Sequence, residues 1–281
     1  MMKKFNFLNK LKQNKIFNII YCFVKKIFND DIFGLTAELT FYLTTSFFPF
    51  LILLLALISI TPLSAEETLF KLLSNLPNEV YTIVVYILTG VERSTVIIAI
   101  SGILSIWSIS GAVSTINKAL NRMYQTEESR HFIIIRSIGF VFAILLAVLI
   151  ILTFFLIIMG NVIGMAISRF FPSFNLLWHV LRLCIAYIVL YISLSFIYKI
   201  LPNKKLNFKS ITVGSLFTAI LWGASSVVFS FYVDNFSKYH IIYGGLAGII
   251  VLISWLYMSS AMLLIGGEIN ATIYLKNKKT G

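Results

Sequence analysis

The chain has 281 residues, of which 59% are hydrophobic and only 12% are charged, and its mean hydropathy is +0.92. This composition leaves too little polar surface to cover a water-soluble globule, so it excludes an ordinary soluble domain. The net charge of +12 would suit nucleic acid, but the basic residues are spread over several segments without the interleaved aromatics of a single-strand binder, so we expect no nucleic-acid partner.

The first 34 residues predict a cytoplasmic segment that contains an amphipathic helix. Between Ile16 and Phe28 the apolar side chains recur at the spacing of one helical face. The opposite face carries Lys15, Lys25 and Lys26. Such a helix lies along a membrane surface, so the expected partners are the lipid bilayer and the anionic headgroups of its inner leaflet. A surface anchor is favoured over a regulatory sensor.

Six apolar runs that follow are long enough to cross a bilayer, because a hydrocarbon core about 30 Å thick needs roughly 20 apolar residues per helix. They predict an all-α, polytopic membrane protein with one six-helix transmembrane domain over 35–275 and a cytoplasmic tail over 276–281. The expected spans are 36–60, 95–116, 137–160, 176–200, 211–233 and 244–273.

The first outer loop is expected to carry two short interfacial helices. The apolar run 80–91 is too short to cross a bilayer, and an amphipathic stretch at 66–76 precedes it. We expect the run 80–91 either to lie at the membrane surface or to re-enter it.

Orientation follows from the basic residues, because short cytoplasmic loops hold lysine and arginine while exported loops lack them. Most of the 23 basic residues fall before the first span, after the second, after the fourth and in the tail. Both termini are therefore expected in the cytoplasm, as an even number of spans requires.

Polar residues inside the spans mark candidate functional positions, because charge in hydrocarbon is costly. Glu38, Tyr42, Thr45 and Pro49 share one face of the first span, which is expected to point into the bundle. Pro49 removes a backbone hydrogen bond in mid-span and predicts a kink there.

The last span carries a matching pair of polar residues, Glu268 and Asn270, near the same end of the bundle. Two alternatives stay open for the glutamates. If Glu38 and Glu268 face each other, one of them could hold a proton. A basic residue between them would instead make both carboxylates ion-paired anchors, and the anchor interpretation is favoured. The candidate partners are Lys118, Arg122 and Arg136.

The predicted substrate or proton pathway joins these side chains to residues at the ends of neighbouring helices. Its further members are Asn117, Arg122, Tyr243, Gly244 and Trp255.

Catalytic signatures are missing from the sequence. The three histidines, His131, His179 and His240, fall in different segments, so no shared metal site is expected. There is no GxxxxGK[ST] phosphate loop and no GxSxG nucleophile elbow. We predict no catalytic residue, no metal and no cofactor, and we do not expect an enzyme.

Four stretches together resemble the YihY/virulence factor BrkB family. They are AELTFYLTTSFFPFLILLLAL (37–57), WSISGAVSTINKALNRMYQTEESR (107–130), YKILPN (198–203) and the block 214–271, whose ending WLYMSSAMLLIGGEINA is the most specific. The order and spacing of these stretches match the family across nearly the whole chain.

The resemblance implies a six-helix protein of the bacterial cytoplasmic (inner) membrane. Members of the family have carried an old ribonuclease label, have been associated with serum resistance, and in some cases resemble exporters of small or amphiphilic molecules, but the sequence pattern does not transfer any of these activities to this chain. We predict a transporter or exporter of a lipid-like or small amphiphilic molecule. The alternative is a non-catalytic membrane scaffold or envelope-integrity protein, and a membrane-embedded hydrolase or ribonuclease is the weakest of the three.

Overall fold

The computed structural model describes residues 15–60, 95–145, 148, 174–235 and 246–280, and within them every regular element is a helix. One helix, Phe132–Leu145, has no number and is named by its bounds. The others are α2 (Lys15–Asn29), α3 (Ile32–Ile60), α6 (Thr95–Met123), α8 (Phe174–Ile200), α9 (Phe208–Asn235) and α11 (Leu246–Thr280).

Five of the described helices, α3, α6, α8, α9 and α11, are long and apolar enough to cross a membrane, judged by length and composition. They coincide with five of the six expected spans, and the all-α membrane class is confirmed. The third expected span, 137–160, is described mainly over the helix Phe132–Leu145. Most of its remainder lies outside the described residues, as do the stretches 66–76 and 80–91.

Two helices continue beyond the ends that hydrophobicity predicts. α6 runs past residue 116 to Met123, and α11 runs past residue 273 to Thr280. The prediction ended each span at the edge of the apolar run, but a helix can extend beyond the hydrocarbon. Basic side chains such as Arg122 suit the last turn, where the helix dipole is negative.

A tight turn at residues 30–31 joins α2 to α3, so α3 begins at Ile32, a few residues before the expected start of the first span at 36. Asp31 has a positive φ of 54°, a conformation that aspartate tolerates better than most residues. The amide of Asp31 donates to the Phe28 carbonyl, and the amide of Leu35 donates to the Asp31 carbonyl. The surface helix is therefore joined directly to the first span.

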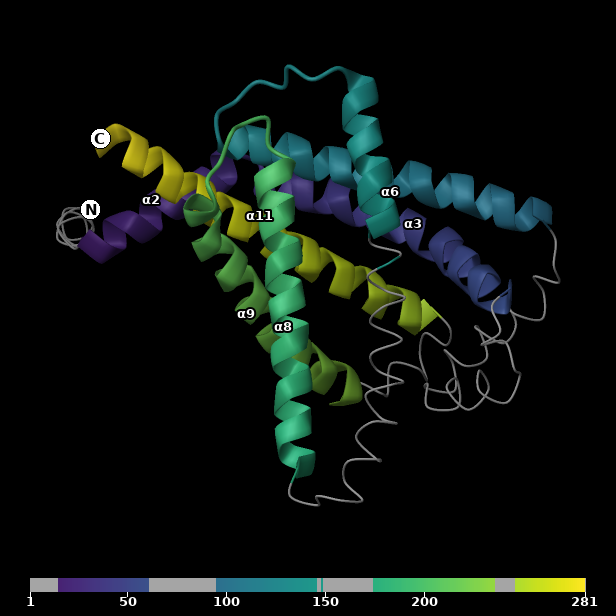
Figure 1. Ribbon diagram of the computed structural model, residues 1–281. Helices are drawn as coiled ribbons and strands as arrows, with labels where there is room; N and C mark the ends of the chain where they lie inside the picture. Colours follow the sequence, from purple (N-terminus) through teal and green to yellow (C-terminus); the bar gives the residue numbers. More distant parts are fainter. Residues whose placement is uncertain (1–14, 61–94, 146–147, 149–173, 236–245, 281) are drawn as a thin grey trace.

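The helices form a layered bundle in which α3 and α6 run side by side and α11 packs against both (Figure 1). α9 packs along α11, and α8 packs on α9. α9 and α11 approach each other closely, and a Cβ on Gly214 would clash with the backbone oxygen of Gly266. Small residues at a helix contact allow backbones to approach this closely.

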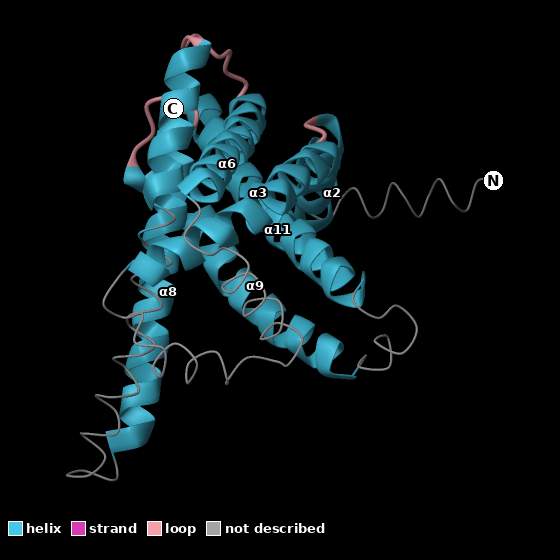
Figure 2. Cartoon of the chain, turned by 90° about the vertical axis from the view of Figure 1, so that its right-hand side faces the viewer, coloured by secondary structure: helices cyan, strands magenta, loops and turns pink. Residues whose placement is uncertain are grey.

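The buried core gathers where several helix ends meet. Its fully buried side chains include Leu120, Met123, Tyr124, Tyr198 and Leu264. We call this region the basic end: α2, the loop 124–131, the loop 201–207 and the last turns of α11. Both loops lie together at the top of the molecule in Figure 2. The segments expected to share the cytoplasmic side thus meet at one end, and its orientation in the membrane stays a prediction.

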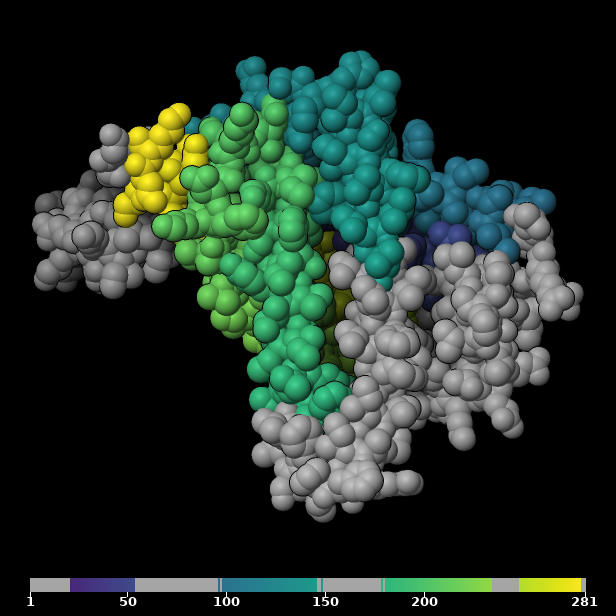
Figure 3. All heavy atoms as spheres, in the orientation of Figure 1, coloured from purple at the N-terminus to yellow at the C-terminus, as the bar shows by residue number. Residues whose placement is uncertain are grey.

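Away from the basic end the helices carry large apolar side chains on their surfaces. Val227, Val228 and Phe231 of α9 are each about 70% exposed, at 72%, 68% and 70%. In Figure 3, α8 and the helix Phe132–Leu145 lie on the face toward the viewer, and both have many exposed aliphatic residues. Exposed apolar surface on helices of this length suits contact with lipid.

Candidate functional site

A buried ion pair lies at the basic end between α2 and α11. The carboxylate of Glu268 has 0% exposure, and its Oε1 lies 2.6 Å from Nζ of Lys26. The same Lys26 ammonium donates to the Met123 carbonyl at 3.3 Å and to the Thr272 hydroxyl at 3.4 Å. The Thr272 hydroxyl in turn donates to Glu268 Oε1 at 3.1 Å. Lys26 thus links α2 to the end of α6 and to α11, and Glu268 is held by Lys26 and by Thr272 of its own helix.

A second carboxylate, Asp30, reaches the same ammonium, with 3.9 Å between Lys26 Nζ and Asp30 Oδ2. Three buried oxygens of this cluster have no hydrogen-bond partner among the described residues: Asp30 Oδ2, Glu268 Oε2 and the Tyr124 hydroxyl. Burial raises the pKa of the Tyr124 phenol, with smaller contributions from Tyr274 and Glu268, so the phenol stays neutral. Two carboxylates therefore share one ammonium, and a single proton would balance the charge.

Glu38 occupies a different site on the surface between α3 and α6. Its Oε2 lies 3.1 Å from Nζ of Lys118, and the side chain is 37% exposed. Thr115 donates to the other carboxylate oxygen at 3.0 Å. Glu38 and Glu268 have no common partner among the described contacts. The structure therefore pairs Glu38 as an anchor, and it does not bring the two glutamates to one site.

The polar face expected to point inward from the first span is only partly inward. The Tyr42 ring covers Gly111 of α6, but Thr45 is exposed and donates to the Phe41 carbonyl of its own helix. Pro49 is half-buried, and α3 continues through it. The inward residues are instead Ile32, Leu35, Thr36, Leu39, Thr40 and Ser46.

The prediction was wrong about the inward face for a physical reason. Thr36 and Thr40 donate to the backbone carbonyls four residues earlier, at 2.7 Å each. Hydroxyl groups that are satisfied within their own helix can be buried without a partner on another helix. The i, i+3 and i+4 spacing identified residues that share a face, but a span that is apolar all round offers no contrast to show which face is inward.

Asn117 belongs to a structural network that joins the two loops of the basic end. The Arg130 guanidinium donates to Glu128 at 2.8 Å, to the Asn117 side-chain oxygen at 2.8 Å and to the Leu201 carbonyl at 2.6 Å. Asn117 and Asn121 both donate to Glu128 Oε2. The hydrogen bond from Arg130, aided by those from the asparagines, lowers the pKa of Glu128 to about 2.

The other predicted pathway residues contact separate neighbours. Arg122 donates to the carbonyl of Asn29, the last residue of α2, at 2.9 Å. The Asn270 side-chain oxygen accepts from the Gly214 amide at 2.7 Å. Tyr243 and Gly244 lie outside the described residues. Trp255 contacts the rings of Trp222 and Phe229 at 5.6 and 5.0 Å between centroids, which is aromatic packing.

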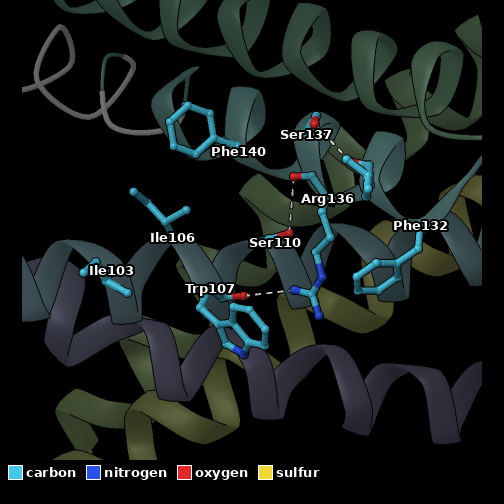
Figure 4. Close-up of a pocket in the computed structure, with 9 residues that line it drawn as sticks. Ile103, Ile106, Trp107, Ser110, Phe132, Arg136, Ser137 and Phe140 are labelled. Atoms are coloured by element: carbon cyan, nitrogen blue, oxygen red, sulfur yellow. Dashed lines mark hydrogen bonds between the residues drawn. The ribbon is translucent and has the colours of Figure 1, made fainter.

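An apolar pocket of about 410 Å³ lies between α6 and the helix Phe132–Leu145 (Figure 4). The guanidinium of Arg136 lies between the rings of Trp107 and Phe132, at 4.7 and 5.1 Å from their centroids. Ile106 and Phe140 lie toward the other end of the pocket. The sequence analysis offered Arg136 as one of three candidate partners for a glutamate, and no carboxylate of the described residues lies within ion-pair distance of it.

Two features escaped the sequence analysis for different reasons. The sequence predicted Lys26 as a headgroup contact, and nothing local links it to Glu268, which is 242 positions away by residue number. The pocket could have been predicted. Arg136 precedes an apolar stretch, and Trp107 lies on the previous span, which together indicate a cation–π contact between the two helices. Among the described residues, no three histidine, cysteine or acidic side chains lie close enough together to hold a metal ion.

Comparison with known proteins identifies relatives over most of the chain. The profile of the family described as "Virulence factor BrkB" matches residues 23–281. The ribonuclease-like protein YfkH of Bacillus subtilis (strain 168) is 36% identical over 254 residues, which cover 86% of this chain and 90% of the relative.

Membrane proteins named UPF0761 match more narrowly. The one from Pseudoalteromonas atlantica (strain T6c / ATCC BAA-1087) is 30% identical over 161 residues, or 57% of this chain and 53% of the relative. The one from Vibrio atlanticus (strain LGP32) is 38% identical over 77 residues, or 27% of this chain and 25% of the relative. No solved structure shows a significant match to the chain.

Proposed function

Because the chain belongs to the BrkB virulence factor family, and its relatives include membrane proteins, we propose that it transports or exports a lipid-like or small amphiphilic molecule across the bacterial inner membrane. The observation that supports this function most directly is the buried cluster of Lys26, Asp30 and Glu268, in which one ammonium serves two carboxylates. The proposal includes proton coupling at Glu268.

Burying this cluster has an energetic cost that a purely structural contact would not need. Removing the Glu268 carboxylate from water costs several kcal/mol, and an apolar pair of similar volume would hold two helices at least as well. A carboxylate with 0% exposure at the end of a membrane span is therefore better explained by a functional role than by anchoring.

The arrangement links protonation of Glu268 to the position of α2. The groups that face this carboxylate are Lys26 of α2, Asp30 in the turn after α2, Tyr124 after α6, and Thr272 on its own helix. A proton on Glu268 would remove the charge that holds the Lys26 ammonium and weaken the contact of α2 with α11. Movement of an amphipathic helix at the basic end would then open or close access to the bundle from the inner leaflet.

Transport is tested with the purified full chain in liposomes that contain a fluorescent phospholipid, under an imposed pH gradient. We expect the wild-type protein to move the probe between leaflets faster when the gradient is present. Glu268→Gln keeps the shape and hydrogen-bonding capacity of the side chain but cannot exchange a proton, so the response to the gradient should disappear. Glu38→Gln is the matched control, since Glu38 is a half-exposed anchor, and its response should persist.

Two results would count against the proposal. If the wild-type chain moves no lipid or amphiphile under any gradient, transport is excluded for these substrates. If Glu268→Gln responds to the gradient as the wild type does, Glu268 is not the coupling group.

The alternative is a non-catalytic scaffold, and one observation favours it. Glu38, Asn117, Arg122 and Arg130 are all engaged in contacts that tie helices and loops together. A scaffold would tolerate Glu268→Gln with unchanged phenotype as long as abundance is unchanged. Neither function includes RNA hydrolysis, and we propose that purified protein incubated with RNA and divalent metal ions leaves the RNA intact.

A further inference from the structure

The pocket between α6 and the helix Phe132–Leu145 is lined by apolar side chains, two serines and one charged group, Arg136. Its volume of about 410 Å³ falls within the range of roughly 300–1,000 Å³ typical of small-molecule sites. Ile103, Ile106 and Phe140 line the part away from Arg136. The charge and the apolar surface are therefore separated along the pocket, as the two parts of an amphiphile are.

The hydroxyl groups of the lining are already used by the backbone. Ser137 donates to the Ile133 carbonyl at 2.9 Å. Ser110 donates to the Arg136 carbonyl at 3.5 Å. The side chain of Arg136 is thus the group in this lining that remains available for a polar ligand.

The Arg136 guanidinium is incompletely paired. Its Nη1 donates to the Trp107 carbonyl at 3.4 Å, a long hydrogen bond. Its Nε is buried and has no hydrogen-bond partner among the described residues. The rings of Trp107 and Phe132 flank the guanidinium and orient it through cation–π contacts. A planar fork of donors with this freedom binds phosphate oxygens in pairs.

The surroundings of the pocket favour a ligand that arrives through the bilayer. Ile103, Trp107 and Ile133 are 67%, 64% and 64% exposed, so apolar surface flanks the opening. Arg136 lies five residues after the loop 124–131, and a long arginine side chain close to such a loop can reach the headgroups of the adjoining leaflet. A free inorganic anion would have to cross this apolar rim without an acyl chain to stabilise it there.

We propose that this pocket binds an anionic membrane phospholipid, with the phosphate on Arg136 and one acyl chain along Ile103, Ile106 and Phe140. The site names the substrate class of the transport function proposed above and rests on that function for its role, although binding can be measured without transport. Positive charge and an apolar trough together select a lipid that carries both a phosphate and a net negative charge.

Binding is tested with the full chain in detergent by native mass spectrometry, with phosphatidylglycerol and phosphatidylcholine as probes. Both lipids carry a phosphate, but only the first is anionic. We expect the wild type to retain phosphatidylglycerol in preference to phosphatidylcholine. Arg136→Gln should lower phosphatidylglycerol affinity about tenfold, as expected for loss of one charge-assisted contact, and abolish the preference.

Two matched pairs of variants separate the site from general effects. Lys205→Gln removes a positive charge from an exposed residue of the loop 201–207 and should leave phosphatidylglycerol binding unchanged. Ile103→Trp should fill the apolar part of the pocket and reduce binding of both lipids. Ile100→Trp adds the same bulk at an exposed position of α6 that does not line the pocket, and it should bind like the wild type. Unchanged thermal unfolding shows that each variant is folded.

Several outcomes would overturn the site. The phospholipid assignment is wrong if Arg136→Gln binds phosphatidylglycerol as tightly as the wild type, or if the wild type retains the two lipids equally. It is also wrong if millimolar inorganic phosphate displaces the lipid. A dimer that Ile103→Trp dissociates would show that a second copy of the chain occupies the pocket. The two proposals can fail separately. Selective binding without lipid movement would retain the site and reject transport, whereas gradient-driven movement with unaltered binding in Arg136→Gln would retain transport and reject the site.

Discussion

Lys26 has the dual character of a surface residue and a core partner. Its side chain keeps 20% exposure, yet its ammonium contacts a carboxylate with none. A long lysine side chain allows this, because the methylene stem crosses the helix interface while the charge reaches a buried acceptor. The amphipathic pattern of α2 therefore describes only part of what this residue does.

Removing the charge of Lys26 should destabilise the protein, because the buried Glu268 carboxylate then has no counter-ion. Lys26→Met leaves Glu268 unpaired, and we expect the free energy of unfolding to fall by about 3 kcal/mol, near the lower end for breaking a buried ion pair. Adding Glu268→Gln to Lys26→Met should recover much of this loss. The measurement is thermal or denaturant unfolding in detergent, with exposed Lys25→Met as the control. Equal losses from the two lysine variants would contradict the buried pair.

We expect the loops at the basic end to become less stable in acid, because Glu128 is ionised in the network that joins them. Its pKa is lowered from 4.5 to about 2, chiefly by the hydrogen bond from Arg130. A lowered pKa in the folded state means that the contribution to stability is complete above pH 4.5 and is lost as the pH falls toward 2. We expect hydrogen exchange in the loops 124–131 and 201–207 to accelerate across this interval.

The control for this acid effect is Glu128→Gln, because other carboxylates titrate in the same range. The variant should exchange faster already at pH 6 and should lose most of the additional acceleration on acidification. If wild type and variant respond equally to acid, the network around Arg130 does not depend on the charge of Glu128.

At the scale of the helices, α9 and α11 depend on a backbone contact that tolerates no added side-chain atom. Gly214→Ala would place a methyl group against the Gly266 carbonyl and the Asn270 side chain. We expect it to lower the free energy of unfolding by about 1–3 kcal/mol, the range for overpacking. Gly248→Ala is the matched control, because its Cβ would meet nothing within 4 Å, and it should be neutral or slightly stabilising. Unfolding of the two variants in detergent decides the comparison.

The existence of the long helices follows from apolar run length, but their ends do not. Run length predicted α3, α8 and α9 to within a few residues, whereas α6 and α11 extend beyond the apolar runs into polar sequence. A membrane limits where apolar residues lie, and it does not end a helix. Asn117, Lys118 and Asn121 stay helical because the last turns of α6 pack into the basic end, where Asn117 and Asn121 are buried.

At the scale of the whole molecule, the segments with most of the basic residues gather at one end, and the positive-inside rule predicts that this end faces the cytoplasm. After replacement of Cys22 and Cys184 by serine, a cysteine at Lys205 should react with an impermeant maleimide only in inside-out vesicles. A cysteine at Asn235, at the opposite end of α9, should react only in intact cells. Labelling of both positions from the same side would contradict the topology.

The sequence by itself determined the properties that can be summed along the chain. Helical class, membrane environment and the grouping of loops all follow from the number of consecutive apolar residues and the positions of lysine and arginine. The family resemblance followed in the same way, from ordered local motifs such as the block that ends in GGEINA.

Only the tertiary structure decided which side chains meet. It paired Glu268 with Lys26 and Glu38 with Lys118, placed Thr45 outside the bundle, and formed the pocket around Arg136. Helices that are apolar on every side have no polarity contrast to orient them, so their contacting faces are selected by shape, by small residues and by a few hydrogen bonds. These interactions form between residues that are far apart in the chain, so the local sequence pattern does not show them.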